Sequence, residues 1–364
     1  MRSLSASLLA LAVVLASSAL SGCASGSSAR AGDATTWTPT LTDQTSGTDA
    51  LLIGSHAIDE NVVWLSGTGG TVVRTTDGGA TWTASVIPGT DTLQLRDIHA
   101  HDAQTAWALS IGSGASSRIF KTTDGGASWR TTFVNDEPDG FLDCFSFWDA
   151  RHGLAFSDSI EDGLYLLTTS DGGETWQRIP PSALPDPLPG EGSFAASGTC
   201  VTTRGRSLGW AGMGNASPAR VLRTDDRGAS WTVASVPVVA GDAAGLASVA
   251  FRTNEVGVAL GGDIARPDSL ADTVARTTDG GRSWTQGGRL PFNGAAYGSA
   301  YVPGTRSVVA VGPGGVALSQ DDGATWTLVD EQTFWGVTAV STDAIWLVGP
   351  EGRIAMMRLT TDEG

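Results

Sequence analysis

The sequence predicts an all-β protein whose strands form the repeated blades of a β-propeller. Its 364 residues include 48 glycines and 13 tryptophans, and stretches with the period of a helix are nearly absent. A short segment, first seen as RTTDGGATWT from position 74, occurs six times. The aspartates of these six segments lie 42 to 55 residues apart, which is the length of one propeller blade.

Each repeated segment is expected to form the turn of an outer β-hairpin, and we call it an Asp turn. It joins a strand-like run that ends in Ser or Thr to another that begins at Trp. The Asp carboxylate can accept backbone N–H groups within the turn, glycine supplies a positive φ, and the Trp ring is buried beside it. We therefore expect a structural role for the repeated residues. They are Asp77, Trp82, Asp124, Trp129, Asp171, Trp176, Asp226, Trp231, Asp279, Trp284, Asp321 and Trp326.

The runs between the Asp turns give the number of blades. Three further strand-like runs precede each turn, so that one unit forms a four-stranded antiparallel blade. The C-terminal segment from Thr333 supplies three strands without an Asp turn, while Thr36-Trp37-Thr38 repeats the strand that follows each turn. The N-terminal strand is therefore expected to complete the last blade and close the ring, which leaves no unpaired sheet edge. We predict a seven-bladed β-propeller over residues 36–360, with six and eight blades as the alternatives.

The first 22 residues are typical of a signal for export. Arg2 precedes an apolar run that is too short to span a membrane as a helix, and Leu-Ser-Gly-Cys follows it. This ending resembles the bacterial lipobox, which implies that Cys23 is lipidated and becomes the mature N-terminus; an ordinary cleaved signal is the alternative. Several acyl chains are enough for stable anchoring. Residues 23–35 would then form a polar, flexible tether.

Charge limits the partners that we expect. The net charge is −16 and Lys121 is the single lysine, so the basic footprint of a nucleic-acid-binding protein is missing. DNA, RNA and direct binding to anionic lipid headgroups are disfavoured. Ala24 stands where an Asp often retains lipoproteins at the inner membrane. We expect a lipid-anchored protein of the cell envelope, in the outer membrane if the cell is Gram-negative.

The repeated segments resemble those of the BNR/Asp-box repeat proteins. Residues 67–79, Gly-Thr-Gly-Gly-x-Val-x-x-Thr-Thr-Asp-Gly-Gly, and the His-Ala-x-Asp-x-x-x-x-Trp element at 56–64 and 99–107 are similar to one branch, the photosystem II stability/assembly-factor-like propellers. The resemblance covers residues 37–360. It implies a non-enzymatic role, which in photosynthetic members is to hold a membrane-protein intermediate during assembly. We expect a monomeric scaffold for an envelope or membrane protein complex, without a cofactor.

Aligned blades place small and polar residues on one alternating side of each innermost strand. We expect this side to line the central channel, where either a ligand or only water would lie. Its candidate residues are His56, Asp97, His99, Ser146 and Tyr301. Arg96 and Asp143 occupy equivalent places on neighbouring blades near the channel mouth. We expect them to form an ion pair between blades, with a role either in structure or in partner recognition.

Cys144 and Cys200 also occupy equivalent places on adjacent innermost strands. Export from the cytoplasm permits a disulfide. A bridge requires Cα atoms within about 7 Å of each other, and the innermost strands of adjacent blades usually lie farther apart. We therefore expect the two thiols to remain separate.

Other functions stay open. A small-ligand or glycan-binding propeller would use exposed aromatic residues at the channel mouth, such as Trp335 or Tyr297. A sialidase-like glycosidase needs an arginine triad and a Tyr–Glu nucleophile pair, and the chain has only three tyrosines. A quinone-dependent propeller oxidoreductase usually has eight blades. The four histidines lack the clustering of zinc ligands and no calcium-loop motif occurs, so no metal site is expected.

Overall fold

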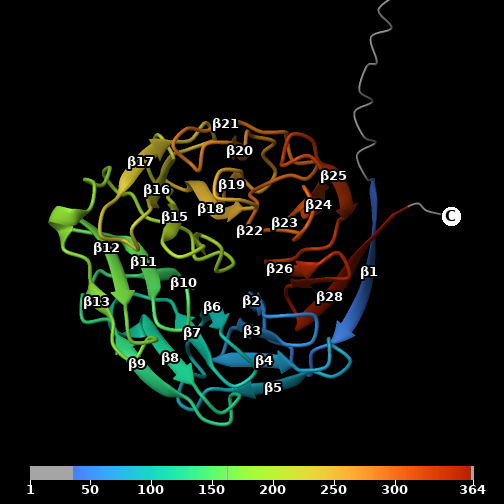
Figure 1. Ribbon diagram of the computed structural model, residues 1–364, viewed down its shortest axis with the longest axis horizontal. Helices are drawn as coiled ribbons and strands as arrows, with labels where there is room; N and C mark the ends of the chain where they lie inside the picture. The colour runs from blue at the N-terminus through green and yellow to red at the C-terminus, as the bar shows by residue number, and fades with distance from the viewer. Residues whose placement is uncertain (1–35, 162, 362–364) are drawn as a thin grey trace, which may run out of the picture. The chain divides into compact units, whose positions relative to one another are not determined.

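Seven four-stranded antiparallel sheets form a ring in the computed structural model (Figure 1). The structure describes residues 36–161 and 163–361, and this part of the chain contains no α-helix and therefore none that could cross a membrane. In six blades the strands follow in chain order from the centre of the ring outward. The predicted all-β, seven-bladed propeller is thus confirmed. The predicted leader, the lipidated Cys23 and the tether lie outside the described residues.

The strands are short, and two 3-10 turns, η1 (Gly114–Ser116) and η2 (Pro181–Ala183), lie between them. The first three blades contain β2 (Leu52–Ala57), β3 (Val63–Gly67), β4 (Thr71–Thr75) and β5 (Thr83–Val86); β6 (Leu95–Ala100), β7 (Ala106–Ser110), β8 (Arg118–Thr122) and β9 (Arg130–Val134); and β10 (Leu142–Phe147), β11 (Gly153–Ile160), β12 (Gly163–Thr169) and β13 (Gln177–Arg178). The next three contain β14 (Val201–Arg204), β15 (Leu208–Gly212), β16 (Arg220–Thr224) and β17 (Thr232–Ser235); β18 (Ala244–Phe251), β19 (Gly257–Asp263), β20 (Val274–Thr277) and β21 (Thr285–Gln286); and β22 (Gly298–Tyr301), β23 (Val308–Gly312), β24 (Gly315–Ser319) and β25 (Thr327–Asp330). The seventh contains β26 (Gly336–Ser341), β27 (Ala344–Val348), β28 (Arg353–Thr361) and β1 (Trp37–Thr45).

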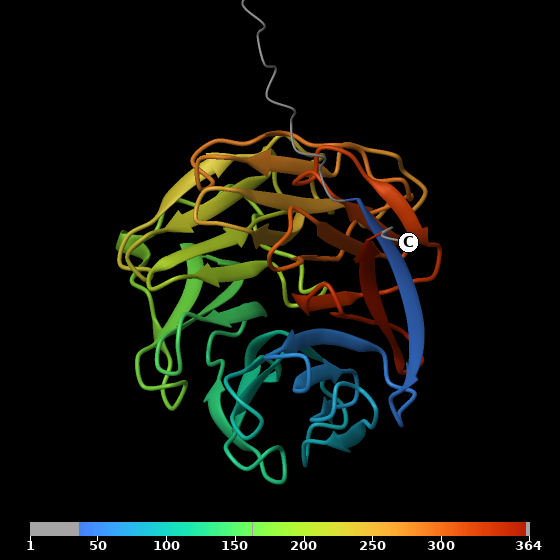
Figure 2. The same ribbon diagram turned by 45° about the vertical axis from the view of Figure 1, so that its right-hand side comes forward.

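The N-terminal strand closes the seventh blade, as the sequence predicted. β1 pairs antiparallel with β28 over nine residues, from Trp37 opposite Thr361 to Thr45 opposite Arg353, and the two strands run side by side in Figure 2. Gln320 of the preceding blade reinforces this seam, because its side chain accepts the Trp37 N–H at 2.7 Å and donates to the Trp37 carbonyl at 3.0 Å. Both ends of the ring are therefore held by one strand pair.

The hydrophobic core is divided into seven clusters, and each cluster joins two adjacent blades. Four tryptophans occupy the same place on the second strand of their blades, Trp64, Trp107, Trp210 and Trp346, and all are fully buried. In the cluster between the first and second blades, for example, Trp64 packs with Ile98 and Phe120 of the second blade. Truncating such a tryptophan to alanine usually costs about 3–5 kcal/mol. Each blade therefore depends on its neighbours to bury its faces.

The Asp turns share one hydrogen-bond pattern. In the first, the Thr75 hydroxyl donates to one carboxylate oxygen of Asp77 at 2.7 Å, and the Thr81 hydroxyl donates to the other at 2.6 Å. The Thr81 N–H also donates to Asp77, at 2.9 Å. These bonds from Thr81, followed by that from Thr75, lower the pKa of Asp77 to about 2. Both oxygens of the Asp77 carboxylate therefore accept hydrogen bonds from within the turn.

A basic residue before the turn links each of four blades to the next blade's Asp turn. Lys121 Nζ donates to the Gly172 carbonyl at 2.7 Å, and Trp107 Nε1 donates to the same carbonyl at 3.0 Å. The residues equivalent to Lys121 in the other linked blades are Arg74, Arg223 and Arg276.

The first residue after the Asp has a positive φ in every Asp turn, including the non-glycine residues Arg227 (61°) and Asp322 (59°).

A variant that begins at Ser46 should lose the closed ring, because β28 would become an unpaired edge and the core beneath Trp37 and Leu41 would open. We expect a stability loss of several kcal/mol and self-association that rises with concentration. Denaturant midpoints and sedimentation measure the two effects. A variant that begins at Thr36 is the control, since it keeps every described strand. Equal stability of the two variants would contradict closure by β1.

Candidate binding groove on the plugged face

The connection between β13 and β14 crosses one end of the central channel. It accounts for the longest spacing between Asp turns, the 55 residues from Asp171 to Asp226. Residues 193–199 of this connection, which we call the plug, contact blades on several sides. The Ala195 carbonyl accepts from Arg96 at 3.0 Å, and the Ser197 hydroxyl donates to the Tyr297 carbonyl at 2.7 Å. In Figure 1 this yellow-green segment reaches toward the centre of the ring.

A disulfide holds the end of the plug. Cys144 and Cys200 are bonded, their Cα atoms lie 6.0 Å apart, and both are fully buried. The expectation of separate thiols is therefore wrong. The expectation assumed that neighbouring innermost strands lie too far apart, but equivalent positions at other blade junctions are also close. A Cβ on Gly54 would lie 2.9 Å from the Cα of Asp97, and the hydroxyl oxygens of Ser248 and Ser299 are 2.7 Å apart.

The plug gives the ring two different faces. The innermost strands begin near it, as Arg96 of β6 and Gly298 of β22 show. In a four-stranded antiparallel blade, the turn between the third and fourth strands lies where the first strand ends. The Asp turns therefore lie on the opposite face, and the face that carries the plug is called the plugged face below.

The channel below the plug encloses about 390 Å³. All five candidates of the expected polar wall line it, namely His56, Asp97, His99, Ser146 and Tyr301. The separation into a channel side and a packing side is less complete than the alternation suggested. Phe145, Phe147 and Phe251, which belong to the opposite, more apolar alternating side of these strands, also line the channel. Both sides of the innermost strands thus border the channel.

Two histidine rings lie against each other in the channel wall, tilted by 36°. The rings of His56 and His99 have centroids 4.1 Å apart, and His56 Nδ1 accepts the Ala100 N–H at 3.2 Å. Burial lowers the pKa of His56 to about 4. Burial, followed by the neighbouring His56 and His101, lowers the pKa of His99 well below its usual value. Both rings are therefore neutral at pH 7.

Asp97 lies between the channel and the plug. One carboxylate oxygen accepts the Ile98 N–H at 2.7 Å and the other accepts the Phe145 N–H of the next blade at 2.8 Å. Burial raises the pKa of Asp97 well above its usual value, although these two N–H groups oppose the shift. Gly198 of the plug passes so close that a Cβ there would lie 2.3 Å from Asp97 Oδ1. Asp97 thus ties two blades together beneath the plug.

A groove of about 430 Å³ lies beside the plug on the plugged face. Trp335 and Tyr297 form one wall, with ring centroids 4.8 Å apart. The Arg96 guanidinium lies over Trp335, 5.0 Å from the ring centroid. The rest of the lining is largely apolar, and it includes Ile111, Phe141, Phe194 and Ile264.

Arg96 and Asp143 both line this groove, but they do not form the expected ion pair in the part of the chain that is described. The plug separates them, because the Ala195 carbonyl accepts from Arg96 while the Ala195 N–H donates to Asp143. Arg96 also donates to Gln94 Oε1, at 2.7 Å. The ion pair was inferred from equivalent positions on neighbouring strands, and those positions do not reveal that the plug passes between the two side chains.

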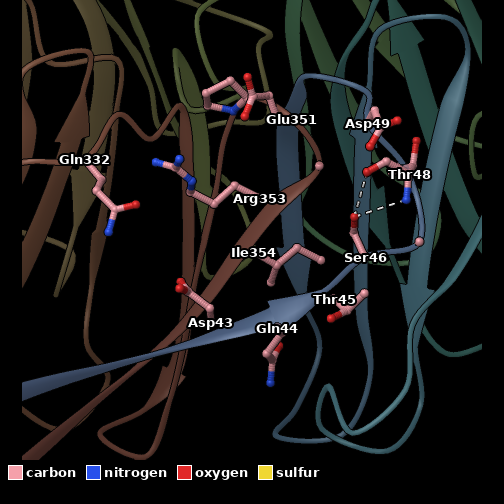
Figure 3. A pocket seen from close by; sticks show the side chains of 13 residues that line it. Asp43, Gln44, Thr45, Ser46, Thr48, Asp49, Gln332, Glu351, Arg353 and Ile354 are labelled. Carbon is pink, nitrogen blue, oxygen red and sulfur yellow. Dashed lines mark hydrogen bonds between the residues drawn. The ribbon is translucent and has the colours of Figure 1, made fainter.

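A third hollow, of about 460 Å³, lies at the seam between β1 and β28 (Figure 3). Its lining includes Asp43 and Arg353 on these two strands. In the adjoining turn, Ser46 Oγ donates to the Thr48 carbonyl at 3.1 Å and accepts the Thr48 N–H at 3.3 Å. No residue that lines it has a buried side-chain polar atom without a hydrogen-bond partner. We regard this hollow as part of the closing seam.

Sequence reasoning missed Asp158 and the plug, which complete the groove. The signal available was the long spacing between Asp171 and Asp226, which marks an insertion without indicating where it folds. Asp158 lies in β11, which extends to Ile160 and is longer than the second strands of most blades. No cluster of three or more potential metal ligands occurs among the residues that the structure describes.

Comparison with known proteins shows the fold alone. No family model and no curated protein matches the chain. A structure described as YCF48 bound to D1 peptide is similar, with a TM-score of 0.59 and 17% identity over 89% of this chain and 95% of that chain. YCF48 from Cyanidioschyzon merolae gives 0.58 and 14%, over 87% and 98%. The RRP9 WD40 repeats give 0.61 and 12%, over 88% and 97%. All share the propeller fold with this chain.

Acidification should destabilise the protein through the channel histidines. In the unfolded chain they take up protons below about pH 6.5, whereas folded His56 does so only near pH 4. The contribution of each histidine to stability is therefore complete above pH 6.5 and is lost as the pH is lowered; for His56 the loss at pH 5 is about 1–2 kcal/mol. Denaturant midpoints at pH 5, 6 and 7 measure the effect.

Replacing His99 by Gln should reduce this pH dependence, and replacing the exposed His101 should largely keep it. Asp97 contributes with the opposite sign, because its raised pKa favours the folded state at low pH. That contribution is common to all variants and cancels in the comparison. Identical pH profiles for wild type and His99→Gln would contradict neutral burial of the pair.

Proposed function

We propose that this protein is a non-enzymatic scaffold of the cell envelope that binds a protein partner on its plugged face. Lipidation of Cys23 would anchor it, and residues 23–35 would let the propeller reach a complex at the membrane surface. The scaffold acts as a monomer and uses no cofactor. The partner is an envelope or membrane protein complex.

The groove on the plugged face is the observation that carries this proposal. Its wall combines Trp335, Tyr297 and Arg96, residue types that are enriched where proteins bind one another. Trp335 and Tyr297 are half-buried, so their shape is fixed while one side stays open to a partner. Ile264 adds an apolar side chain that is 46% exposed at the same groove. Because these aromatic rings are already held in place, little conformational entropy is lost when a partner binds to them.

The similar structures support the proposal only by analogy. One of them, YCF48, was solved bound to D1 peptide, so a propeller of this fold can hold a peptide. This agrees with the resemblance of the sequence to assembly-factor-like propellers. The argument for this chain rests on its own groove, since the identity of 17% carries no residue-level correspondence.

A small-ligand or glycan-binding function is the second candidate, and the channel favours it. Tyr301 and Ser55 both line the channel, and their hydroxyl oxygens are buried without a hydrogen-bond partner in residues 36–161 and 163–361. A small polar ligand or water molecules would satisfy them. This function would show as binding of isolated sugars that Tyr301→Phe weakens and Trp335→Ala leaves unchanged.

Replacing Trp335 by Ala should abolish partner capture. The full-length protein is used to enrich proteins from detergent-solubilised native membranes, and the recovered proteins are quantified for wild type and variant. We expect the proteins enriched by wild type to fall about tenfold or more, because a central aromatic residue of an interface contributes at least about 2 kcal/mol.

Leu328→Ala is the matched control, because Leu328 is 42% exposed on the outer strand β25 and does not line the groove. It should retain capture. Unfolding midpoints of both variants verify that the ring is intact. Equal enrichment by wild type and Trp335→Ala would refute binding at this groove.

A further inference from the structure

Asp143 is a buried carboxylate with an unused oxygen. The residue is only 1% exposed, it lines the groove on the plugged face, and its Oδ2 has no hydrogen-bond partner among the described residues. The Ala195 N–H is the hydrogen-bond donor of the plug that reaches this carboxylate. Buried polar atoms are almost always partnered in proteins, so an unpartnered carboxylate oxygen at the wall of a groove needs an explanation.

Asp158 places a second carboxylate in the same groove. It lies on β11, beside β10, which carries Asp143, and its Oδ1 accepts the Ser193 N–H at 2.9 Å. Burial, followed by the charge of Asp158, raises the pKa of Asp143 well above its usual value. Burial also raises the pKa of Asp158. The pair thus lacks a positive charge that would stabilise both carboxylates in ionised form.

The cations of the chain do not supply that charge within the described residues. Arg96 shares the groove, but its guanidinium is held by Gln94, the Ala195 carbonyl and the Trp335 ring. Glu191 lies in an adjoining hollow and is paired with Arg220. Asp139 and Asp242 line the same hollow, which shares Asp158 with the groove. This end of the groove is acidic.

The rest of the groove suits an aliphatic chain. Phe141, Phe194 and Ile264 line it, and its volume of about 430 Å³ exceeds that of one long side chain. Lysine and arginine bury their methylene stems along apolar surface and carry a cation at the tip. A free amine without a stem would use the carboxylates but leave the apolar wall empty.

We propose that the groove receives a lysine or arginine side chain of the partner polypeptide, whose cation binds between Asp143 and Asp158. This deepens the proposed function and rests on it. The methylene stem lies against Phe141, Phe194 and Ile264, and the cation donates to the unpartnered Oδ2 of Asp143. The proton that leaves the carboxyl pair on binding passes to solvent. Charge-assisted bonds at this point would set which partner segments fit.

The test compares two short probes on the full-length protein, N-acetyl-lysine methylamide and N-acetyl-norleucine methylamide, which have similar stems and differ in the charged tip. Binding is followed by calorimetry and by shifts of the amide resonances of the groove. We expect the lysine probe to bind about tenfold or more tightly than the norleucine probe. Asp143→Asn should remove this preference and leave norleucine binding unchanged.

Asp91→Asn is the matched control, because Asp91 is exposed and outside the groove, and it should bind both probes as wild type does. Asp158→Asn gives an independent reading if Asp143→Asn fails to fold. Equal affinity of the two probes for wild type, or tighter binding of cadaverine than of the lysine probe, would overturn the inference. Loss of capture by Trp335→Ala without a preference for lysine would overturn the cationic anchor alone and leave the scaffold function standing.

Discussion

A peptide carbonyl in the Asp turn of one blade accepts hydrogen bonds from the blade before it, and the ring depends on this contact. In the third turn the Gly172 carbonyl receives both Lys121 and Trp107 of the second blade. In the fifth turn the Gly280 carbonyl receives Arg223 and Trp210 in the same way. The Asp hydrogen bonds hold the turn in the conformation that presents this carbonyl. Four of the six Asp turns therefore secure their own hairpin and also position the preceding blade.

This arrangement divides the molecule into a structural face and a variable face. The Asp turns use their carboxylates internally, so the face that carries them offers few free groups. On the plugged face the connections differ in length, and the plug is held there by the disulfide between Cys200 and Cys144 and passes close over Asp97. Aromatic side chains and two carboxylates without a neutralising cation can lie beside the plug because the seven-bladed propeller supplies the stability of the fold. Strained or desolvated groups are expected where a fold can support them.

The ring was predictable because its signals are local and repeated. Each Asp turn carries its own hydrogen-bond partners, and the strand at Trp37 repeats the strand found after every turn. The groove was only partly predictable: Arg96, Asp143, Trp335 and Tyr297 were recognised, but their relation depends on a connection without a repeated pattern. The plug separates the expected ion pair, and the closeness of neighbouring innermost strands, which the repeated pattern does not reveal, permits the Cys144–Cys200 disulfide. One further signal was overlooked, the cation that precedes four of the Asp turns and reaches the turn of the next blade. The third unit has Thr168 at this place, and the sixth has Leu318, where the next blade has no Asp turn.

Lys121 and Arg130 allow the most direct test, because both bind Glu174, and only Lys121 also reaches the Gly172 carbonyl. The side chain of Lys121 is 9% exposed and that of Arg130 is 50% exposed. Replacing Lys121 by Met should lower the free energy of unfolding by about 1.5–3 kcal/mol, whereas Arg130→Met should change it by less than about 1 kcal/mol. Denaturant unfolding of wild type and the two variants measures these changes in the free energy of unfolding. Equal and small losses would show that the ring does not depend on the bond between blades.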